Sequence, residues 1–335
     1  MQTFNKQSFT TAGFFTLGLR MVVGWTYFSA FWRRLILENK LIETEAGYIG
    51  VKFNHFLPNA LGIKPIIEYL VTHPDALWWA MVVFTVVEAI VGLFIMLGLF
   101  TRLMAIGVFS LAMGILLGSG WIGTTCLDEW QIGVLGVSTG FMLFLTGGGI
   151  GSLDYYFSKK NFTFTTKKWF GLLGSGELPI KNLKPIVFVG SFAVLGLTLY
   201  TNQVFHGGVF GTLHNKSVKP KLELTDVKLQ NNELKFQVYR VEGADVYGSF
   251  LIGIQLETQS GEILHKWDGE ALSKLSPSNI ENIYVAHVKP GKHSLVIPLG
   301  AKADLSLPVS LDTQESLVLK MIDVSGIEWT ASVGK

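Results

Sequence analysis

Long apolar stretches dominate the chain up to about residue 210, and no other feature limits its fold as strongly. A helix needs about 20 apolar residues to cross the roughly 30 Å hydrocarbon core of a bilayer. Five stretches meet or approach that length: residues 11–32, 79–100, 103–120, 131–146 and 185–206. From Lys219 onward, short alternating segments are separated by polar turns. The sequence therefore predicts a membrane part followed by a water-soluble part.

Charge and cysteine content exclude several classes of protein. Only 16% of the 335 residues are charged, and the net charge of +2 comes without a basic run, which argues against nucleic-acid binding. The single cysteine, Cys126, excludes an internal disulfide, a cysteine-ligated iron–sulfur cluster and a CxxCH haem attachment. The glycine-rich runs do not follow a strand and open a helix, and the histidines lack metal-ligand spacing, so no flavin or metal signature is present.

The lysines and arginines beside the apolar stretches predict how the chain crosses the membrane. If five helices alternate, one side collects most of them: Lys6, Arg102, Lys159, Lys160, Lys167, Lys168, Lys181 and Lys184. That side should be cytoplasmic. We therefore expect a multi-pass protein of the cytoplasmic (inner) membrane with its amino terminus inside. The loops 33–77 and 121–130 and the carboxyl-terminal part would then be exoplasmic, or periplasmic.

The carboxyl-terminal part has the period-two alternation of half-buried strands. Strand patterns occur at residues 221–227, 233–238, 248–257, 293–298, 306–311 and 316–324, whereas 271–281 has none. About 115 residues of short strands suggest an immunoglobulin-like β-sandwich without the usual cysteine pair. The expected divisions are a four-helix bundle at 1–160, a cytoplasmic linker at 161–184, a fifth transmembrane helix with a glycine-rich junction at 185–218, and the β-domain at 219–335.

Two charged residues, Arg20 and Glu88, lie in the middle of the first two apolar stretches. Ionisable groups at that depth are costly and are usually paired inside the bundle. Counted from Trp32 and Trp78, their depths differ by only about 3 Å, which predicts an Arg20–Glu88 ion pair. That pair could be purely structural; alternatively, Glu88 could relay a proton or Arg20 could hold an anion. Gly24 and Gly92 follow the two charges at i+4 and would allow close helix approach.

A second cluster lies in the loop that contains Cys126, with Asp128, Glu129 and Trp130 just after it. Two neighbouring carboxylates disfavour a thiolate, so a reactive thiol there would need a cation such as Arg33 or Arg34. These two arginines lie on the expected outer side, where positive charges are rare. They either snorkel at a helix end or attract an anion. Equally, a lone cysteine can be an inert buried residue.

Several short motifs resemble a known membrane family. They are Leu19-Arg20 with Gly24 and Phe28, then Glu88, Gly92, Gly98 and Thr101-Arg102, then Gly149-Ile150-Gly151-Ser152-Leu153-Asp154. This pattern resembles the four-helix DoxD/DoxX family over roughly residues 10–160. The segments Thr201-Asn202-Gln203 and Gly207-Gly208-Val209-Phe210-Gly211-Thr212-Leu213-His214-Asn215-Lys216 look like the start of DoxA. The chain thus resembles a DoxD–DoxA fusion, which implies a thiosulfate:quinone oxidoreductase that forms tetrathionate.

The resemblance assigns roles to the candidate residues. Thiosulfate is a dianion that arginine can hold, which makes Arg20, Arg33 and Arg34 candidates for substrate binding. The membrane quinone, a co-substrate, could contact Trp121 or Trp130. Protons for its reduction could come from Asp128, Glu129 or Glu88. One hypothesis is that Cys126 forms an S-thiosulfonate, which a second thiosulfate resolves. In the rival mechanism, thiosulfate attacks the quinone directly.

Other readings stay open on the sequence alone. The chain could be a non-enzymatic membrane scaffold or ligand-binding protein that presents its β-domain outside, or an anion carrier, although no pair of broken helices is visible. Turnover of thiosulfate with a soluble quinone analogue would distinguish the enzyme from the scaffold. The sequence also leaves the oligomeric state open, a homo-oligomer included.

Overall fold

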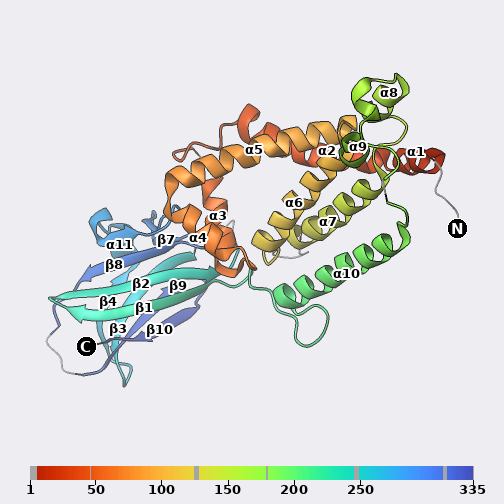
Figure 1. Cartoon of the computed structure of the whole chain (residues 1–335). Coiled ribbons are helices and arrows are strands. Elements are labelled where there is room, and N and C mark those ends of the chain that lie inside the picture. The colour runs from red at the N-terminus through yellow and green to blue at the C-terminus, as the bar shows by residue number, and fades with distance from the viewer. Residues whose placement is uncertain are drawn as a thin grey trace. The chain divides into compact units, whose positions relative to one another are not determined.

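The computed structural model describes residues 6–45, 47–123, 128–178, 180–244, 249–311 and 315–334. The chain divides into two compact units. A helical unit contains the described parts of Met1–Tyr48, Trp78–Gly120 and Asp128–His214. A β unit contains those of Ile49–Leu77, Trp121–Leu127 and Asn215–Lys335. Each unit is described by itself below, with the element labels of Figure 1.

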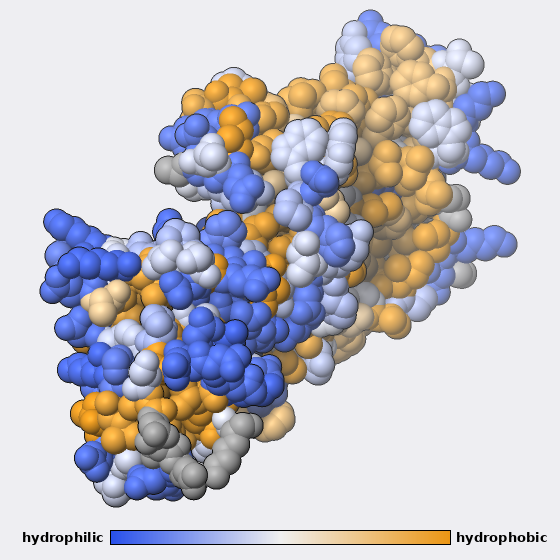
Figure 2. All heavy atoms as spheres, turned by 90° about the vertical axis from the view of Figure 1, so that its left-hand side faces the viewer, coloured by the Kyte–Doolittle hydropathy of each residue, from blue (hydrophilic) through white to orange (hydrophobic). Residues whose placement is uncertain are grey.

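The helical unit has a helix over each of the five apolar stretches. Its elements are α1 (Lys6–Phe15), α2 (Leu17–Phe31), the π-helical turn η1 (Trp32–Leu37), α5 (Pro74–Leu97), α6 (Thr101–Ser119), α7 (Asp128–Thr146), α8 (Leu153–Lys159), the 3₁₀ turn η3 (Thr163–Thr166), α9 (Lys168–Leu173) and α10 (Lys184–His206). Among the described residues, α5, α6 and α10 are long and apolar enough to cross a membrane. Figure 2 shows largely hydrophobic surface over the helices.

The first apolar stretch differs from the single helix expected. It is interrupted at Thr16, whose hydroxyl donates to the Gly13 carbonyl at 2.7 Å, and it continues past Trp32 as η1. The sequence shows no proline here to announce a break. Gly13 instead lies so close to Gly149 that an added Cβ would overlap the backbone of that residue. A tertiary contact therefore accompanies the break, and local propensity does not reveal it.

Small residues allow the helices to pack closely, as expected for Gly24 and Gly92. A Cβ on Gly24 would overlap the Gly92 carbonyl oxygen, and a Cβ on Gly92 would overlap the Phe28 backbone nitrogen. The crossing of α2 and α5 therefore depends on both glycines. Helices α6 and α7 lie side by side, with Gly133 and Gly140 against α6 (Figure 1).

The β unit consists of two antiparallel sheets, which confirms the predicted all-β domain. Its strands are β1 (Lys221–Gln230), β2 (Glu233–Glu242), β3 (Ser249–Thr258), β4 (Ile263–Asp268), β5 (Ile280–Asn282), β6 (Lys289–Pro290), β7 (Leu295–Ile297), β8 (Lys302–Pro308), β9 (Leu317–Asp323) and β10 (Glu328–Ser332). One sheet has the order β1-β2-β8-β5; the other has β10-β9-β3-β7-β6, with β4 paired to β3. The buried side chains of both sheets form one apolar core.

The predicted strand patterns correspond to β1, β2, β3, β7, β8 and β9, and the turn at Asn231 and Asn232 joins β1 to β2 with positive φ at both residues. The prediction missed β4, β5, β6 and β10. Strand β10 lies at a sheet edge, and β5 and β6 are very short, so they bury few side chains. Residues 271–281, expected to lack a strand, hold the end of helix α11 (Gly269–Ser273), the 3₁₀ turn η4 (Pro277–Asn279) and the start of β5.

The long loop before α5 is part of the β unit. It contains α3 (Gly50–Phe56), the 3₁₀ turn η2 (Leu57–Asn59) and α4 (Lys64–Thr72). Asn54 is fully buried and joins two backbone segments: its Nδ2 donates to the Gly300 carbonyl at 2.9 Å, and its Oδ1 accepts from the Ala286 amide at 3.0 Å. This loop and the strands are therefore held together by hydrogen bonds of a buried side chain.

A second bond joins the loop to the strands. The Tyr284 hydroxyl donates to Glu68 Oε1 at 2.8 Å. Burial raises the pKa of the Tyr284 phenol, and its bond to Glu68 raises that pKa further. The phenol therefore stays protonated as a donor at neutral pH.

Replacing Asn54 with Leu should destabilise the β unit. The substitution removes both hydrogen bonds and leaves a buried amide and a buried carbonyl without partners, at a cost of about 2 to 5 kcal/mol. We expect a lower midpoint in thermal unfolding of the purified full chain. Gln259→Leu, at an exposed position in the turn between β3 and β4, is the matched control and should melt like the wild type. Equal midpoints for both variants would show that Asn54 does not hold the loop.

Candidate functional site

A buried ion pair joins η1 to α5 in the helical unit. Arg34 Nη1 contacts Glu88 Oε2 and also donates to Thr85 Oγ1 at 3.1 Å. The Glu88 side chain is 5% exposed, and that of Arg34 is 15% exposed. The guanidinium also lies over the Phe84 ring, 5.7 Å from its centroid. The Glu88 carboxylate is thus largely shielded from solvent, and it pairs with an Arg34 guanidinium that is still partly exposed.

The predicted Arg20–Glu88 pair is wrong, and the helix crossing explains why. Gly24 contacts Gly92 where the two antiparallel helices cross. Along the helix axes, Arg20 therefore lies beside the carboxyl-terminal end of α5, and Glu88 lies on the other side of the crossing, past Phe28. Arg34 follows Arg20 by 14 residues, or about 21 Å of helix. The prediction took Trp32 and Trp78 as equal in depth, but the helix continues past Trp32 to Leu37. Glu88 therefore meets Arg34.

Arg20 is fully buried at the other end of the crossing. Its guanidinium makes long hydrogen bonds to the carbonyls of Ile95, at 3.5 Å, and Gly151, at 3.4 Å. Its Nε has no partner among the described residues. Gly98 has a positive φ, and a Cβ there would overlap Arg20 Nη1. The missing side chain at Gly98 and the Gly151 carbonyl thus accommodate the buried guanidinium, and the role in substrate binding predicted for Arg20 stays a prediction.

Asp154 organises this end of the helical unit. Its Oδ1 accepts from the Phe100 amide at 2.8 Å, and its Oδ2 accepts from the Thr101 amide at 2.9 Å and from the hydroxyls of Thr101 and Ser175 at 2.8 Å. Phe100 has φ of 46°, which is unusual for a residue with a side chain. The carboxylate therefore holds the strained turn between α5 and α6 in place.

Arg102 completes the same region from the first turn of α6. Its Nε donates to the Phe144 carbonyl at 2.9 Å, and its two terminal nitrogens donate to the carbonyls of Gly171 and Gly176. From the sequence, Arg102 is expected on the cytoplasmic side and, with Thr101, belongs to the family motif. Its burial could not have been found from spacing, because its partners are backbone carbonyls of later segments.

The structure separates the remaining candidates. Cys126 lies outside the described residues. Asp128 is exposed and, with Glu129, begins α7. Trp130 Nε1 donates to Thr201 Oγ1 on α10 at 3.0 Å. Arg33 is exposed, and its Nε donates to the Ser29 carbonyl at 3.3 Å.

Trp121 lies inside the protein. Its indole is fully buried, and its Nε1 donates to the Phe56 carbonyl at 3.1 Å. The contact with a quinone ring that the sequence predicts for Trp121 or Trp130 stays a prediction, and of these two indoles that of Trp130 is partly exposed.

One histidine of the helical unit is buried. His206 ends α10 and is 2% exposed, with Nε2 at 2.9 Å from the Gly120 carbonyl oxygen. A carbonyl only accepts, so Nε2 carries the hydrogen, and Nδ1 is an acceptor without a partner in the described structure. No group of three or more His, Cys, Asp or Glu side chains within the described ranges is placed to hold a metal ion.

An apolar groove lies between α6 and α7, lined by Ala105, Ile106, Phe109, Gly140, Phe141 and Phe144. Its volume is about 260 Å³. No sequence pattern predicted this groove, although Gly140 marks the close approach of the two helices. The groove suits an isoprenoid or acyl chain, and it has no polar side chain to bind a quinone carbonyl.

Comparison with known families gives two matches. The family described as "TQO small subunit DoxD" matches residues 15–181, and the family described as "TQO small subunit DoxA" matches residues 205–332. The two matches follow one another along the chain and correspond to the mainly helical part and the mainly β part. The motif residues Gly98, Thr101 and Asp154 fall in the first match, where the structure gives them a shared role in the α5–α6 turn.

Replacing Asp154 with Asn should destabilise the helical unit. The new amide would direct N–H groups at some of the four donors that now point at the carboxylate, so about 2 to 4 kcal/mol should be lost. Thermal unfolding of the purified chain in detergent measures the effect. Glu177→Gln, at an exposed position of the same unit, is the control. A wild-type midpoint for Asp154→Asn would contradict the role given to this carboxylate.

Proposed function

We propose that this chain, which belongs to the DoxD and DoxA families of thiosulfate:quinone oxidoreductase subunits, oxidises two thiosulfates to tetrathionate and reduces a membrane quinone. The balanced reaction takes two thiosulfate dianions, one quinone and two protons to one tetrathionate dianion and one quinol. The reaction needs a site for anions, a route for protons and access for an apolar co-substrate.

The buried Arg34–Glu88 pair is the observation that carries this proposal. Contacts among the described residues use Arg34 Nη1, so Nη2 and Nε are further donors for a sulfonate group. Arg33 precedes Arg34 and adds a second positive charge at the same helix end. Glu88 is a carboxylate shielded from water and in contact with that cation, which suits a group that transfers protons to the quinone. Substrate binding and proton delivery would thus share one ion pair.

The proposed covalent route uses Cys126. Its thiolate and one thiosulfate would be joined as the quinone takes two electrons and two protons, which forms a cysteine S-thiosulfonate and quinol. A second thiosulfate would attack the outer sulfane sulfur, release tetrathionate and regenerate the thiolate. This hypothesis rests on the sequence, because Cys126 lies outside the described residues. In the alternative, thiosulfate attacks the quinone directly and the arginines only bind anions.

Three features of the helical unit support a quinone site. The groove between α6 and α7 suits the isoprenoid chain of the quinone. Trp130 offers an indole at the start of α7, next to Asp128 and Glu129, which are proposed as proton donors. His206 Nδ1 is a further acceptor near the end of α10, the helix to which Trp130 is bonded through Thr201.

The proposed location is the cytoplasmic membrane, with the amino terminus inside. The basic residues beside the apolar helices support this orientation. The β unit and the loop packed on it would then face the exterior, where thiosulfate arrives. A soluble quinone analogue and thiosulfate, added to the purified chain, test the reaction by quinol absorbance and tetrathionate formation. Properly folded protein without turnover would favour a scaffold.

Glu88→Gln should lower kcat by about 100-fold, the contribution typical of a positioned proton carrier. It also leaves Arg34 unpaired, so stability should fall. The double variant Glu88→Gln with Arg34→Gln removes both charges and should recover stability but not turnover. Glu38→Gln is the control, because Glu38 forms an exposed ion pair with Lys40. If the double variant recovered turnover as well, the pair would be structural only.

Cys126→Ala and Cys126→Ser should both abolish tetrathionate formation if the covalent route operates. Intact-mass spectra of the wild type, exposed to thiosulfate and quinone without reductant, should show an added thiosulfate that the variants lack. Full activity in Cys126→Ala would exclude the covalent route and favour direct attack on the quinone, with the rest of the proposal unchanged.

A further inference from the structure

The segment between α7 and α10 has the composition of a membrane-surface element. Residues 153–173, here called the surface segment, contain four lysines and one acidic residue: Lys159, Lys160, Lys167, Lys168 and Asp154. Large apolar and aromatic side chains of the same segment are exposed, namely Tyr156, Phe162, Trp169 and Leu172. Exposed aromatic rings beside lysines are typical of segments that lie on an anionic bilayer surface.

The surface segment lies at the amino-terminal ends of two apolar helices, α6 and α10. Asp154 accepts hydrogen bonds from Thr101, the first residue of α6, and the chain continues after the segment to Lys184, the first residue of α10. Both α6 and α10 are candidate membrane spans. The surface segment therefore lies where the hydrocarbon core gives way to lipid headgroups.

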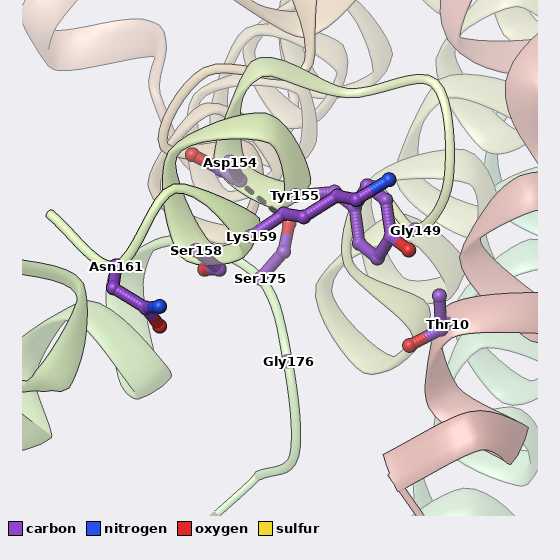
Figure 3. A pocket seen from close by; sticks show the side chains of 9 residues that line it. All are labelled: Thr10, Gly149, Asp154, Tyr155, Ser158, Lys159, Asn161, Ser175 and Gly176. Atoms are coloured by element: carbon purple, nitrogen blue, oxygen red, sulfur yellow. Dashed lines mark hydrogen bonds between the residues drawn. The ribbon is translucent and has the colours of Figure 1, made fainter.

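A pocket opens at the surface segment, lined mostly by residues that carry polar groups (Figure 3). Its volume is about 320 Å³, within the range of small-ligand sites. Its lining residues are Thr10, Gly149, Asp154, Tyr155, Ser158, Lys159, Asn161, Ser175 and Gly176. Lys159, Ser158, Tyr155 and Asn161 bring an ammonium, two hydroxyls and an amide to the lining, all of them hydrogen-bond donors.

The acidic residue in the lining does not oppose an anion as strongly as a bare carboxylate would. Asp154 accepts four hydrogen bonds, from Phe100, Thr101 and Ser175, and its bond to Ser175 is drawn in Figure 3. These bonds leave Lys159 as the charged group of the lining that is exposed. The pocket thus combines one exposed positive charge with several neutral donors.

We propose that this pocket binds the phosphate of an anionic phospholipid. Lys159 would pair with the phosphodiester, and the Tyr155 hydroxyl, which lies on the same side as the Lys159 ammonium in Figure 3, would donate to one of its oxygens. A free phosphate ion has the same headgroup chemistry, but the exposed Phe162 and Trp169 rings of the surface segment favour a molecule whose chains enter the bilayer. The lipid would fix the surface segment, and through Asp154 the α5–α6 turn, against the membrane.

Binding of fluorescently labelled phosphatidylglycerol and phosphatidylcholine to the full chain in detergent tests this proposal. Phosphatidylglycerol should bind at least about fivefold more tightly, and added salt should weaken the preference. The double variant Lys159→Gln with Tyr155→Phe should lose the preference. Lys181→Gln removes an exposed lysine outside the pocket lining and should keep it.

Thermal unfolding of the double variant, expected at the wild-type midpoint, shows that the fold is intact. Equal binding of the two lipids by the wild type, or a preference that survives in the double variant, would overturn the proposal. Inorganic phosphate is the remaining probe. If it bound with the same dependence on Lys159 while phosphatidylglycerol showed no preference, the pocket would be a site for free anions and not for lipid. None of these measurements depends on thiosulfate turnover.

Discussion

The crossing of α2 and α5 at Gly24 and Gly92 determines the arrangement of the helical unit. Because glycine has no side chain, the two helices approach until their backbones are in contact. The residues in contact then determine which residues of α2 and α5 lie opposite each other along the helix axes. In this alignment Glu88 contacts Arg34, and Arg20 donates to the carbonyls of Ile95 and Gly151. The buried ion pair, which is the centre of the proposed chemistry, is thus a consequence of a contact between two glycines.

The opposite end of the unit depends on a carboxylate. Asp154 holds the left-handed Phe100 and the first turn of α6, while Arg102 gathers the carbonyls of three later segments. The family motif residues therefore include some that hold the fold, such as Asp154 and Arg102, and one proposed to act in the reaction, Glu88. The same carboxylate lines the pocket proposed to bind lipid phosphate, so one residue connects the turn, the surface segment and the bilayer boundary.

Prediction from sequence succeeded where the signal is local. Apolar length revealed the helices, and alternation revealed β1, β2, β3, β7, β8 and β9, because burial of one face leaves a regular pattern in the residues themselves. It failed for β10, an edge strand, and for β5 and β6, which are too short to show a pattern. It also did not reveal that Trp121 and His206 are buried against carbonyls of distant residues.

The sequence by itself determined the two-part architecture, the residues that could carry charge inside the membrane and the family motifs. Only the tertiary structure decided which charges meet. Arg20, Arg33 and Arg34 are equivalent as sequence letters, yet one is buried on carbonyls, one is exposed and one pairs with Glu88. The reason is geometric: residue spacing fixes distances along a helix, whereas partners across helices depend on where backbones touch and on where a helix breaks or extends, as at Thr16 and η1.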